Sequence, residues 1–213
     1  ENLADKISKE VFTGGPVESF EKAGKLQLIT LLKFGLLPES KLLDIGCGAL
    51  RGGYWCINFL KSGNYFGIEP NKSMLETGKR VLLGTELLNE KRPSFSNNDQ
   101  FNLDVFDTKF DYLIARSIWT HASLDQINKM LDQFILVGNP NAILLTSYLK
   151  AGLLRRQYKG RDWKGISHQS DKKGLAYYKF RTIKRICNAR GLNVKQVNFD
   201  VMNNQYWLQI TRQ

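Results

Sequence analysis

The chain has 213 residues, of which 42% are hydrophobic and 24% charged, as expected for a globular protein with one full core. No apolar run approaches the ~20 residues that span a bilayer, and the polar first ten residues carry no secretion signal, so we expect a cytoplasmic protein without a membrane span. The cysteines lack metal-binding or redox spacing, and we expect reduced thiols at Cys47, Cys56 and Cys187.

The net charge of +11 is concentrated in one part of the sequence. Residues 150–195 hold 14 Lys or Arg and two acids, a net charge of +12, whereas the rest of the chain sums to −1. The basic character therefore belongs to one segment and is not a property of the whole surface.

Strands and helices are expected to alternate along the chain. Apolar runs bounded by turn residues predict five strands before the basic segment. In chain order these are KLLDI at 41–45, NYFGIE at 64–69, a weak strand near 93–97, FDYLIA at 110–115 and AILLTSYL at 142–149. Helical spacing predicts helices over about 16–35, over about 50–61, after Asn71, after Ser123 and over about 177–190.

Capping signals support several of these boundaries. Asn71 suits the N-cap of its helix, and Ser123 with Gln126 forms an S-x-x-Q capping box. Gly191 suits the end of the last helix. The segments LNVKQVNFD and QYWLQITRQ then predict two strands joined across a VMNN turn, a terminal hairpin.

This order of elements predicts an α/β fold. We expect a doubly wound, mostly parallel sheet with helices on both faces and a C-terminal antiparallel hairpin. Repeats, low-complexity tracts and linkers are absent from the sequence, which favours a single domain over residues 1–213. Within it, the helix at about 16–35 precedes the sheet and a basic insertion occupies about 150–176.

A glycine-rich turn follows the first strand, in LLDIGCGALRGG at 42–53. Gly46 and Gly48 allow a tight turn and close approach of a ligand to the backbone, next to the N-terminus of a helix. Glu69 ends the next strand, 23 positions after Gly46, where a carboxylate accepts hydrogen bonds from two ribose hydroxyls.

The same turn argues against a dinucleotide. The fingerprint G-x-G-x-x-G requires a third glycine at the position that Arg51 occupies. Asp44 precedes the first glycine by two residues and would repel a pyrophosphate. A carboxylate there suits a ligand that carries positive charge or amino donors.

Three stretches, LLDIGCGALRGG, YFGIEPN and FDYLIARSIWTH, resemble the class I S-adenosylmethionine-dependent methyltransferases, from about residue 20 to the end of the chain. The resemblance implies a seven-stranded sheet whose last strand is antiparallel. It also implies that S-adenosylmethionine is the cofactor and S-adenosylhomocysteine the product.

The resemblance assigns roles by position. Asp44, Gly46 and Gly48 would line the methionine part of the cofactor, and Glu69 would hold the ribose. Asp99 would lie near the adenine, with Asn98 as a competitor, and Arg116 would help to close the pocket. For Arg51 we weigh pairing with the methionine carboxylate against a surface position at the start of a helix. The candidate cofactor-binding residues are Asp44, Gly46, Cys47, Gly48, Arg51, Glu69, Pro70, Asp99 and Arg116.

Methyl transfer is an in-line displacement, and a hydroxyl acceptor benefits from a general base. The two histidines, His121 and His168, are the candidate catalytic residues, against the alternatives of a structural hydrogen bond and a solvated loop residue. Trp119 and Trp163 suit walls of an acceptor pocket or core packing.

Several related activities lack their signatures here. Methylation of exocyclic nucleobase amines goes with [DNS]-P-P-[YFW] after the fourth strand, where this chain has ARSI. Pyrimidine-C5 methylation needs a cysteine at that place, and metal-dependent methylation needs carboxylates after the fourth and fifth strands. The sequence supplies neither, and we expect no metal.

The basic segment interleaves cations with aromatic residues, a pattern that binds nucleic acid or phosphorylated small molecules. We expect methylation of an oxygen or nitrogen of a small polar acceptor, anionic or phosphate-bearing, such as a sugar or metabolite. The alternatives are an RNA methyltransferase that uses residues 150–195 and a non-catalytic cofactor-binding protein. The candidate substrate-binding residues are Arg155, Arg156, Trp163 and His168.

Overall fold

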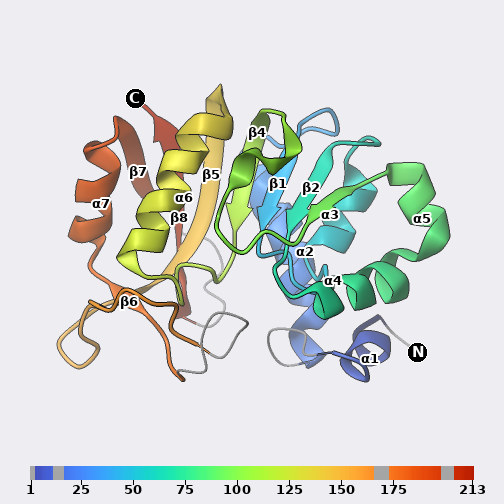
Figure 1. The fold of residues 1–213 in the computed structure, drawn as a ribbon, viewed down its shortest axis with the longest axis horizontal. Coiled ribbons are helices and arrows are strands. Elements are labelled where there is room, and N and C mark those ends of the chain that lie inside the picture. Colours follow the sequence, from blue (N-terminus) through green and yellow to red (C-terminus); the bar gives the residue numbers. More distant parts are fainter. Residues whose placement is uncertain (1–2, 12–16, 166–172, 198–203) are drawn as a thin grey trace. The chain divides into compact units, whose positions relative to one another are not determined.

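The computed structural model describes residues 3–11, 17–165, 173–197 and 204–213, in two compact units of residues 1–99 and 100–213 (Figure 1). Within these residues, no helix is both long and apolar enough to cross a membrane. His168 and most of the VMNN turn lie outside the described residues.

The first unit contains three parallel strands in the order β3-β2-β1. They are β1 (Leu42–Ile45), β2 (Tyr65–Ile68) and β3 (Ser94–Ser96), so the weak third strand is confirmed. Every residue of β1 and β2 is buried, as expected for parallel strands made almost entirely of apolar residues.

Helices of the first unit follow the expected order with shifted ends. The N-terminal helix starts at Phe20, after a 3₁₀ turn, and the helix expected from about 50 starts only at Gly53. Leu50 has φ +61°, which keeps the chain out of the right-handed helix before that point. Asn71 is confirmed as an N-cap, because its side chain accepts a hydrogen bond of 3.0 Å from the Met74 N–H. The helical elements are α1 (Leu3–Ser8), η1 (Val17–Ser19), α2 (Phe20–Lys33), α3 (Gly53–Phe59), α4 (Lys72–Gly78), the π-helical η2 (Lys79–Leu83) and α5 (Gly84–Lys91).

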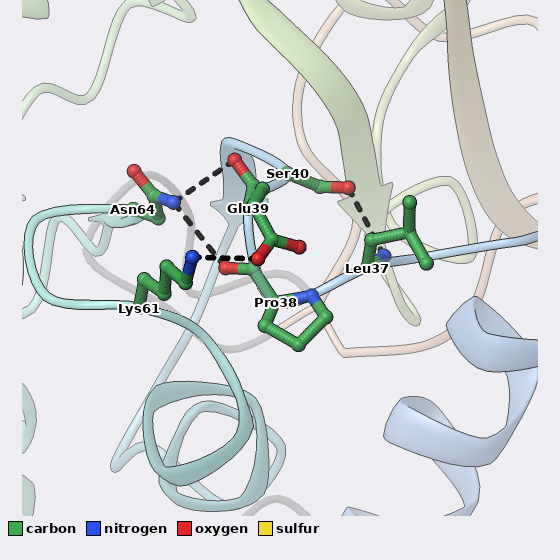
Figure 2. A network of polar contacts seen from close by, with 6 residues as sticks. All are labelled: Leu37, Pro38, Glu39, Ser40, Lys61 and Asn64. Atoms are coloured by element: carbon green, nitrogen blue, oxygen red, sulfur yellow. Dashed lines mark hydrogen bonds and ion pairs between the residues drawn. The ribbon is translucent and has the colours of Figure 1, made fainter.

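Polar contacts join the segments that enter β1 and β2 (Figure 2). The Asn64 amide donates to the carbonyls of Pro38 and Glu39, at 3.3 and 3.0 Å. Lys61 forms an ion pair of 2.7 Å with the Glu39 carboxylate. This network fixes the amino ends of the two strands, opposite to the ends where the glycine turn begins.

The second unit combines parallel and antiparallel pairing in the order β4-β5-β8-β7. β4 and β5 are parallel, whereas β8 runs antiparallel to both β5 and β7, which confirms the expected α/β class with a terminal hairpin. A short strand, β6, pairs with the end of β5 and was not expected. The strands are β4 (Phe110–Ala115), β5 (Gly138–Lys150), β6 (Tyr177–Tyr178), β7 (Leu192–Val197) and β8 (Tyr206–Arg212).

The helices of this unit are η3 (Leu103–Phe106), α6 (Leu124–Val137) and α7 (Phe180–Asn188). The capping box is confirmed: Ser123 and Gln126 each accept from the other's backbone N–H. The helix expected from 177 was wrong in its first turn. Tyr177 and Tyr178 pair with β5 instead, and the buried Tyr178 hydroxyl donates to the Ala122 carbonyl at 2.6 Å.

Candidate functional site

The glycine turn, residues 46–52, starts where β1 ends. Gly46 and Gly48 have φ values of +74° and +56°, which side chains rarely adopt. The N–H groups of Gly46 and Cys47 both donate to the Ile68 carbonyl, at 2.8 and 3.0 Å, and tie the turn to the end of β2. The sequence-based prediction of a tight turn is confirmed.

Two helices pack directly onto the backbone of the glycine turn. A Cβ atom on Gly24 of α2 would lie 2.2 Å from the Arg51 carbonyl oxygen, and one on Gly78 of α4 would lie 2.6 Å from that of Ala49. Gly52 meets the Gln27 side chain in the same way, at 2.4 Å. The turn therefore has no room for an added methyl group at these contacts. Sequence reasoning missed Gly24 and Gly78, because their packing partners lie far away in the chain.

Glu69 braces the turn from the end of β2. Its buried carboxylate accepts from the Gly48 N–H at 3.0 Å and from the Asn71 N–H at 2.8 Å. The Asn97 amide, which the sequence did not reveal, donates to the Glu69 carbonyl at 2.7 Å. Each carboxylate oxygen has two lone pairs, so the oxygens that hold the turn retain acceptor capacity for ligand hydroxyls.

Asp44 lies within β1 with only 4% of its surface exposed. Its carboxyl group accepts a 2.7 Å hydrogen bond from the Tyr65 hydroxyl. Burial raises the pKa of Asp44 to about 7; the Tyr65 hydrogen bond opposes this shift and the nearby Glu69 charge adds to it. Such a carboxyl group gains charge readily when a cation binds beside it. The role of Tyr65 could not be predicted from the sequence, because this residue comes from a different strand, β2.

The other candidates of the first unit differ in exposure. Cys47 is buried, and burial raises the pKa of its thiol well above the ordinary value, which disfavours the thiolate form. Arg51 is half-buried two residues before α3, and burial lowers the pKa of its guanidinium group. Pro70 is half-buried between Glu69 and the Asn71 cap, whereas Asp99 is exposed beyond β3.

In the second unit, a buried polar network follows the end of β4. Ser117 has φ +60°, and its N–H donates to the Ser147 hydroxyl at 2.8 Å. The Gln205 side chain bonds both hydroxyls, at 2.8 Å to Ser117 and 2.7 Å to Ser147. Next to it, the half-buried Arg116 places its guanidinium group 5.0 Å from the centre of the Trp207 ring. The sequence did not predict this network, because Gln205 lies 88 positions from Ser117.

His121 is held in one orientation. Its Nδ1 lies 2.7 Å from the Lys164 carbonyl oxygen, and its ring stacks on Trp163 with centroids 5.5 Å apart. A carbonyl only accepts, so Nδ1 carries the proton and Nε2 of the neutral ring keeps its lone pair. Burial lowers the pKa of His121 below 6.5, against the opposing effect of the Lys164 carbonyl. The structure thus joins two candidates, His121 and Trp163, whereas Trp119 is fully buried in the core.

Two groups of cations follow β5 in the second unit. On the cationic loop, residues 150–158, the Lys150 ammonium lies 5.9 Å from the Tyr206 ring centre and the Arg155 guanidinium 5.3 Å from that of Tyr177. Arg156 is exposed and does not share that arrangement. The cations of α7 form an exposed face, and Arg190, two residues after the end of that helix, forms an ion pair of 2.6 Å with Asp132. Part of the positive charge therefore belongs to an ordinary amphipathic helix, as one alternative predicted.

Comparison of sequences identifies related proteins. The family described as "Methyltransferase domain" matches residues 20–197. An uncharacterised protein of Rickettsia prowazekii (strain Madrid E) is 30% identical over 122 residues, which are 54% of this chain and 46% of the relative. The matched region thus spans about half the length of that relative.

Comparison of structures gives the same fold. Magnesium protoporphyrin IX methyltransferase of Synechocystis PCC 6803, crystallised with bound S-adenosylmethionine, is 14% identical with a TM-score of 0.65, over 97% of this chain and 84% of that one. The CcbJ methyltransferase from Streptomyces caelestis is 14% identical with a TM-score of 0.66, over 99% and 96% of the two chains. The glycopeptide N-methyltransferase MtfA is 10% identical with a TM-score of 0.65, over 89% and 90%. At these identities the likeness concerns the fold.

Proposed function

The chain belongs to the methyltransferase domain family, and from this premise we propose that it transfers the methyl group of S-adenosylmethionine to a small anionic acceptor. The observation that carries the donor half is the glycine turn, whose Gly48 N–H is held by the carboxylate of Glu69. A turn, a helix N-terminus and an acid at the next strand end together form a nucleoside site. Solved relatives of the same fold contain S-adenosylmethionine or its product.

The donor roles follow from charge and position. Glu69 accepts hydrogen bonds from the ribose hydroxyls, and the backbone of Gly46 and Gly48 lines the methionine part. Asp44 balances the positive charge of the cofactor, and Arg51 pairs with its carboxylate. Cys47 and Pro70 shape the wall around these groups. Asp99 serves the adenine.

The chemical step needs little beyond positioning and a proton acceptor. An oxygen or nitrogen of the acceptor attacks the methyl carbon, the carbon–sulfur bond breaks, and its electron pair stays on sulfur to give S-adenosylhomocysteine. Nε2 of His121 takes the proton that the acceptor loses, because the Lys164 carbonyl fixes the proton of the ring on Nδ1. His168 is the second candidate for this role.

An anionic acceptor is favoured by the cations of the second unit. The cationic loop presents Lys150 and Arg155 on tyrosine rings, and Trp163 covers His121. Charge of this sign attracts phosphate or carboxylate groups. An RNA acceptor is the second candidate, on the observation that α7 exposes Arg181, Lys184 and Arg185 along one side.

Calorimetry tests the donor half directly. We expect S-adenosylhomocysteine to bind the wild-type chain at micromolar concentration, and the Glu69→Ala variant to lose most of that affinity. Absence of binding at high micromolar concentration would refute the methyltransferase proposal. RNA binding with an affinity that falls steeply between about 50 and 200 mM salt would favour the RNA acceptor, because each neutralised phosphate releases counterions.

A further inference from the structure

A cavity of about 300 Å³ lies at the carboxyl end of β5, within the second unit. The pairing register brings its walls together: Leu149 pairs with Tyr177 of β6, and Tyr148 pairs with Tyr206 of β8. Lys150 and Arg155 complete the lining from the cationic loop. None of the residues proposed above for the cofactor or for proton transfer lines this cavity.

The charge of this cavity is wholly positive. Lys150 and Arg155 supply two cations, and no acid occurs among the described residues that line it. Neither cation forms an ion pair within the described part of the chain. Each instead lies over a tyrosine ring, which holds the charged group in place without neutralising it.

The loop that carries Arg155 is tied to β6 by its backbone. The Ala151 N–H donates to the Tyr178 carbonyl and the Tyr158 N–H to that of Tyr177, both at 2.9 Å. A third bond of 2.9 Å, from the Gly152 N–H to the Arg155 carbonyl, closes the turn between these anchors. Arg155 is therefore presented by a defined turn, which lowers the entropy lost when a ligand binds.

We propose that this cavity binds the phosphate group of the methyl acceptor, a phosphate monoester of a small polar molecule. The inference rests on the proposed function and names the acceptor class for it. Arg155 offers paired N–H donors that match phosphate oxygens, and Lys150 adds a point charge. A volume near 300 Å³ is at the lower end for small-molecule sites and suits one phosphorylated unit. A nucleic-acid strand would instead need an extended groove with stacking platforms.

The test compares two double variants that remove the same charge. Lys150→Ala/Arg155→Ala removes both cavity cations, whereas Lys22→Ala/Lys129→Ala removes two exposed cations that do not line the cavity. Inorganic phosphate and glucose 6-phosphate are titrated calorimetrically into each protein at low salt, with glucose as the uncharged control. We expect the cavity variant to bind both phosphates at least about tenfold more weakly, because charged hydrogen bonds are lost, and the control variant to match wild type. Lys150→Arg, which conserves the charge and leaves Arg155 in place, should keep most of the affinity.

Each other outcome overturns the inference. A phosphate site at this cavity is excluded if wild-type protein binds neither inorganic phosphate nor glucose 6-phosphate. It is also excluded if the two double variants lose the same amount of phosphate affinity. If the protein binds no phosphate and the Lys150→Ala/Arg155→Ala variant still binds an oligonucleotide, the basic residues outside the cavity bind nucleic acid. Titration with S-adenosylhomocysteine separates the two proposals. Wild type that binds this product but no phosphate refutes only the cavity, whereas wild type that does not bind the product refutes the proposed function.

Discussion

The glycine turn of the first unit and the cationic loop of the second bind their proposed ligands with different parts of the chain. The turn relies on backbone: positive φ angles at Gly46 and Gly48, and N–H groups held by Glu69 and by the end of β2. The loop relies on side chains, with Lys150 and Arg155 exposed on tyrosine rings. The turn is enclosed by packed helices, whereas the loop borders an open cavity.

The two regions therefore differ in how closely ligand binding is coupled to the stability of the fold. A change in the turn meets backbone strain and neighbouring atoms within 3 Å, so cofactor binding and folding are affected together. A change in the loop removes an exposed side chain, and surface changes of this kind alter stability little. Substitutions in the turn should therefore change ligand binding and stability together, whereas substitutions in the loop should change ligand binding alone.

The largest effect is expected at His121, which is proposed to act in proton transfer and not in binding the cofactor at the turn or the acceptor at the loop. His121→Gln should lower kcat by ~10²–10⁴-fold, because Nε2 no longer accepts the acceptor's proton. The wild-type rate should rise with pH through the lowered pKa of His121, below 6.5, and this rise should vanish in the variant. Steady-state kinetics across pH 5–8 measure both effects.

The matched control for this prediction is Trp163→Phe, which keeps an aromatic ring against the imidazole. It should retain most of the activity and the pH profile. A His121→Gln variant with unchanged kcat would assign the proton transfer elsewhere, and His168 is the next candidate.

Next in size is the loss of the Glu69 carboxylate. Glu69→Ala should weaken S-adenosylhomocysteine binding by roughly 10–100-fold, since hydrogen bonds to a charged group are worth about 1.5–3 kcal/mol. It should also lower the unfolding free energy, because the Gly48 and Asn71 N–H groups lose their partner. Calorimetry measures the loss of affinity and urea denaturation the loss of unfolding free energy. Variants of the cationic loop should not show both losses. Glu76→Ala, on an exposed helix face, is the control and should change neither.

Local sequence patterns predicted the glycine turn and two helix caps. The turn follows from a strand that ends in glycines, and the caps at Asn71 and Ser123 follow from residues three positions apart. These features depend on neighbours in the chain, so their signal is visible without the fold. The strand expected at 142–149 was found as part of a longer one, β5, that starts at Gly138.

Contacts between distant residues could not be predicted in this way. The bond from Tyr65 to Asp44 joins two strands, and the cavity at the end of β5 needs Tyr177 and Tyr206 beside Lys150. The prediction that a helix starts at about 177 was wrong for the same reason. The local pattern suits a helix, but pairing with β5 satisfies the backbone as a strand. Tertiary pairing decides such short segments.

A smaller effect is expected where α2 packs against the turn. Gly24→Ala should lower the unfolding free energy by about 1–3 kcal/mol, because the new methyl group meets the Arg51 carbonyl and the surrounding backbone must shift. Urea denaturation measures the change. Gly152→Ala, at a glycine with open space around it, should change stability by less than about 0.5 kcal/mol. Equal stability in the two variants would contradict the close packing of the turn.

The last predicted effect is a dependence of stability on pH, and it concerns the charge of Asp44. Its pKa is raised to about 7 in the folded chain, from near 4 when unfolded, so the folded state binds the extra proton. The stability from this group is complete below pH 4 and is lost as the pH rises through 7, at no more than about 1.4 kcal/mol per pH unit. Urea denaturation between pH 5 and 8 should show this slope in wild type and a flatter one in Asp44→Asn. An equally steep slope in the variant would assign the proton to another group.

Binding of the proposed cofactor should release a proton near pH 7. The cofactor is a cation, so it should favour the charged form of the Asp44 carboxyl group. Titrations in two buffers of different ionisation enthalpy detect the released proton. Removing the cations of the loop should leave that proton release unchanged, since their ligand and the cofactor are proposed to bind different residues.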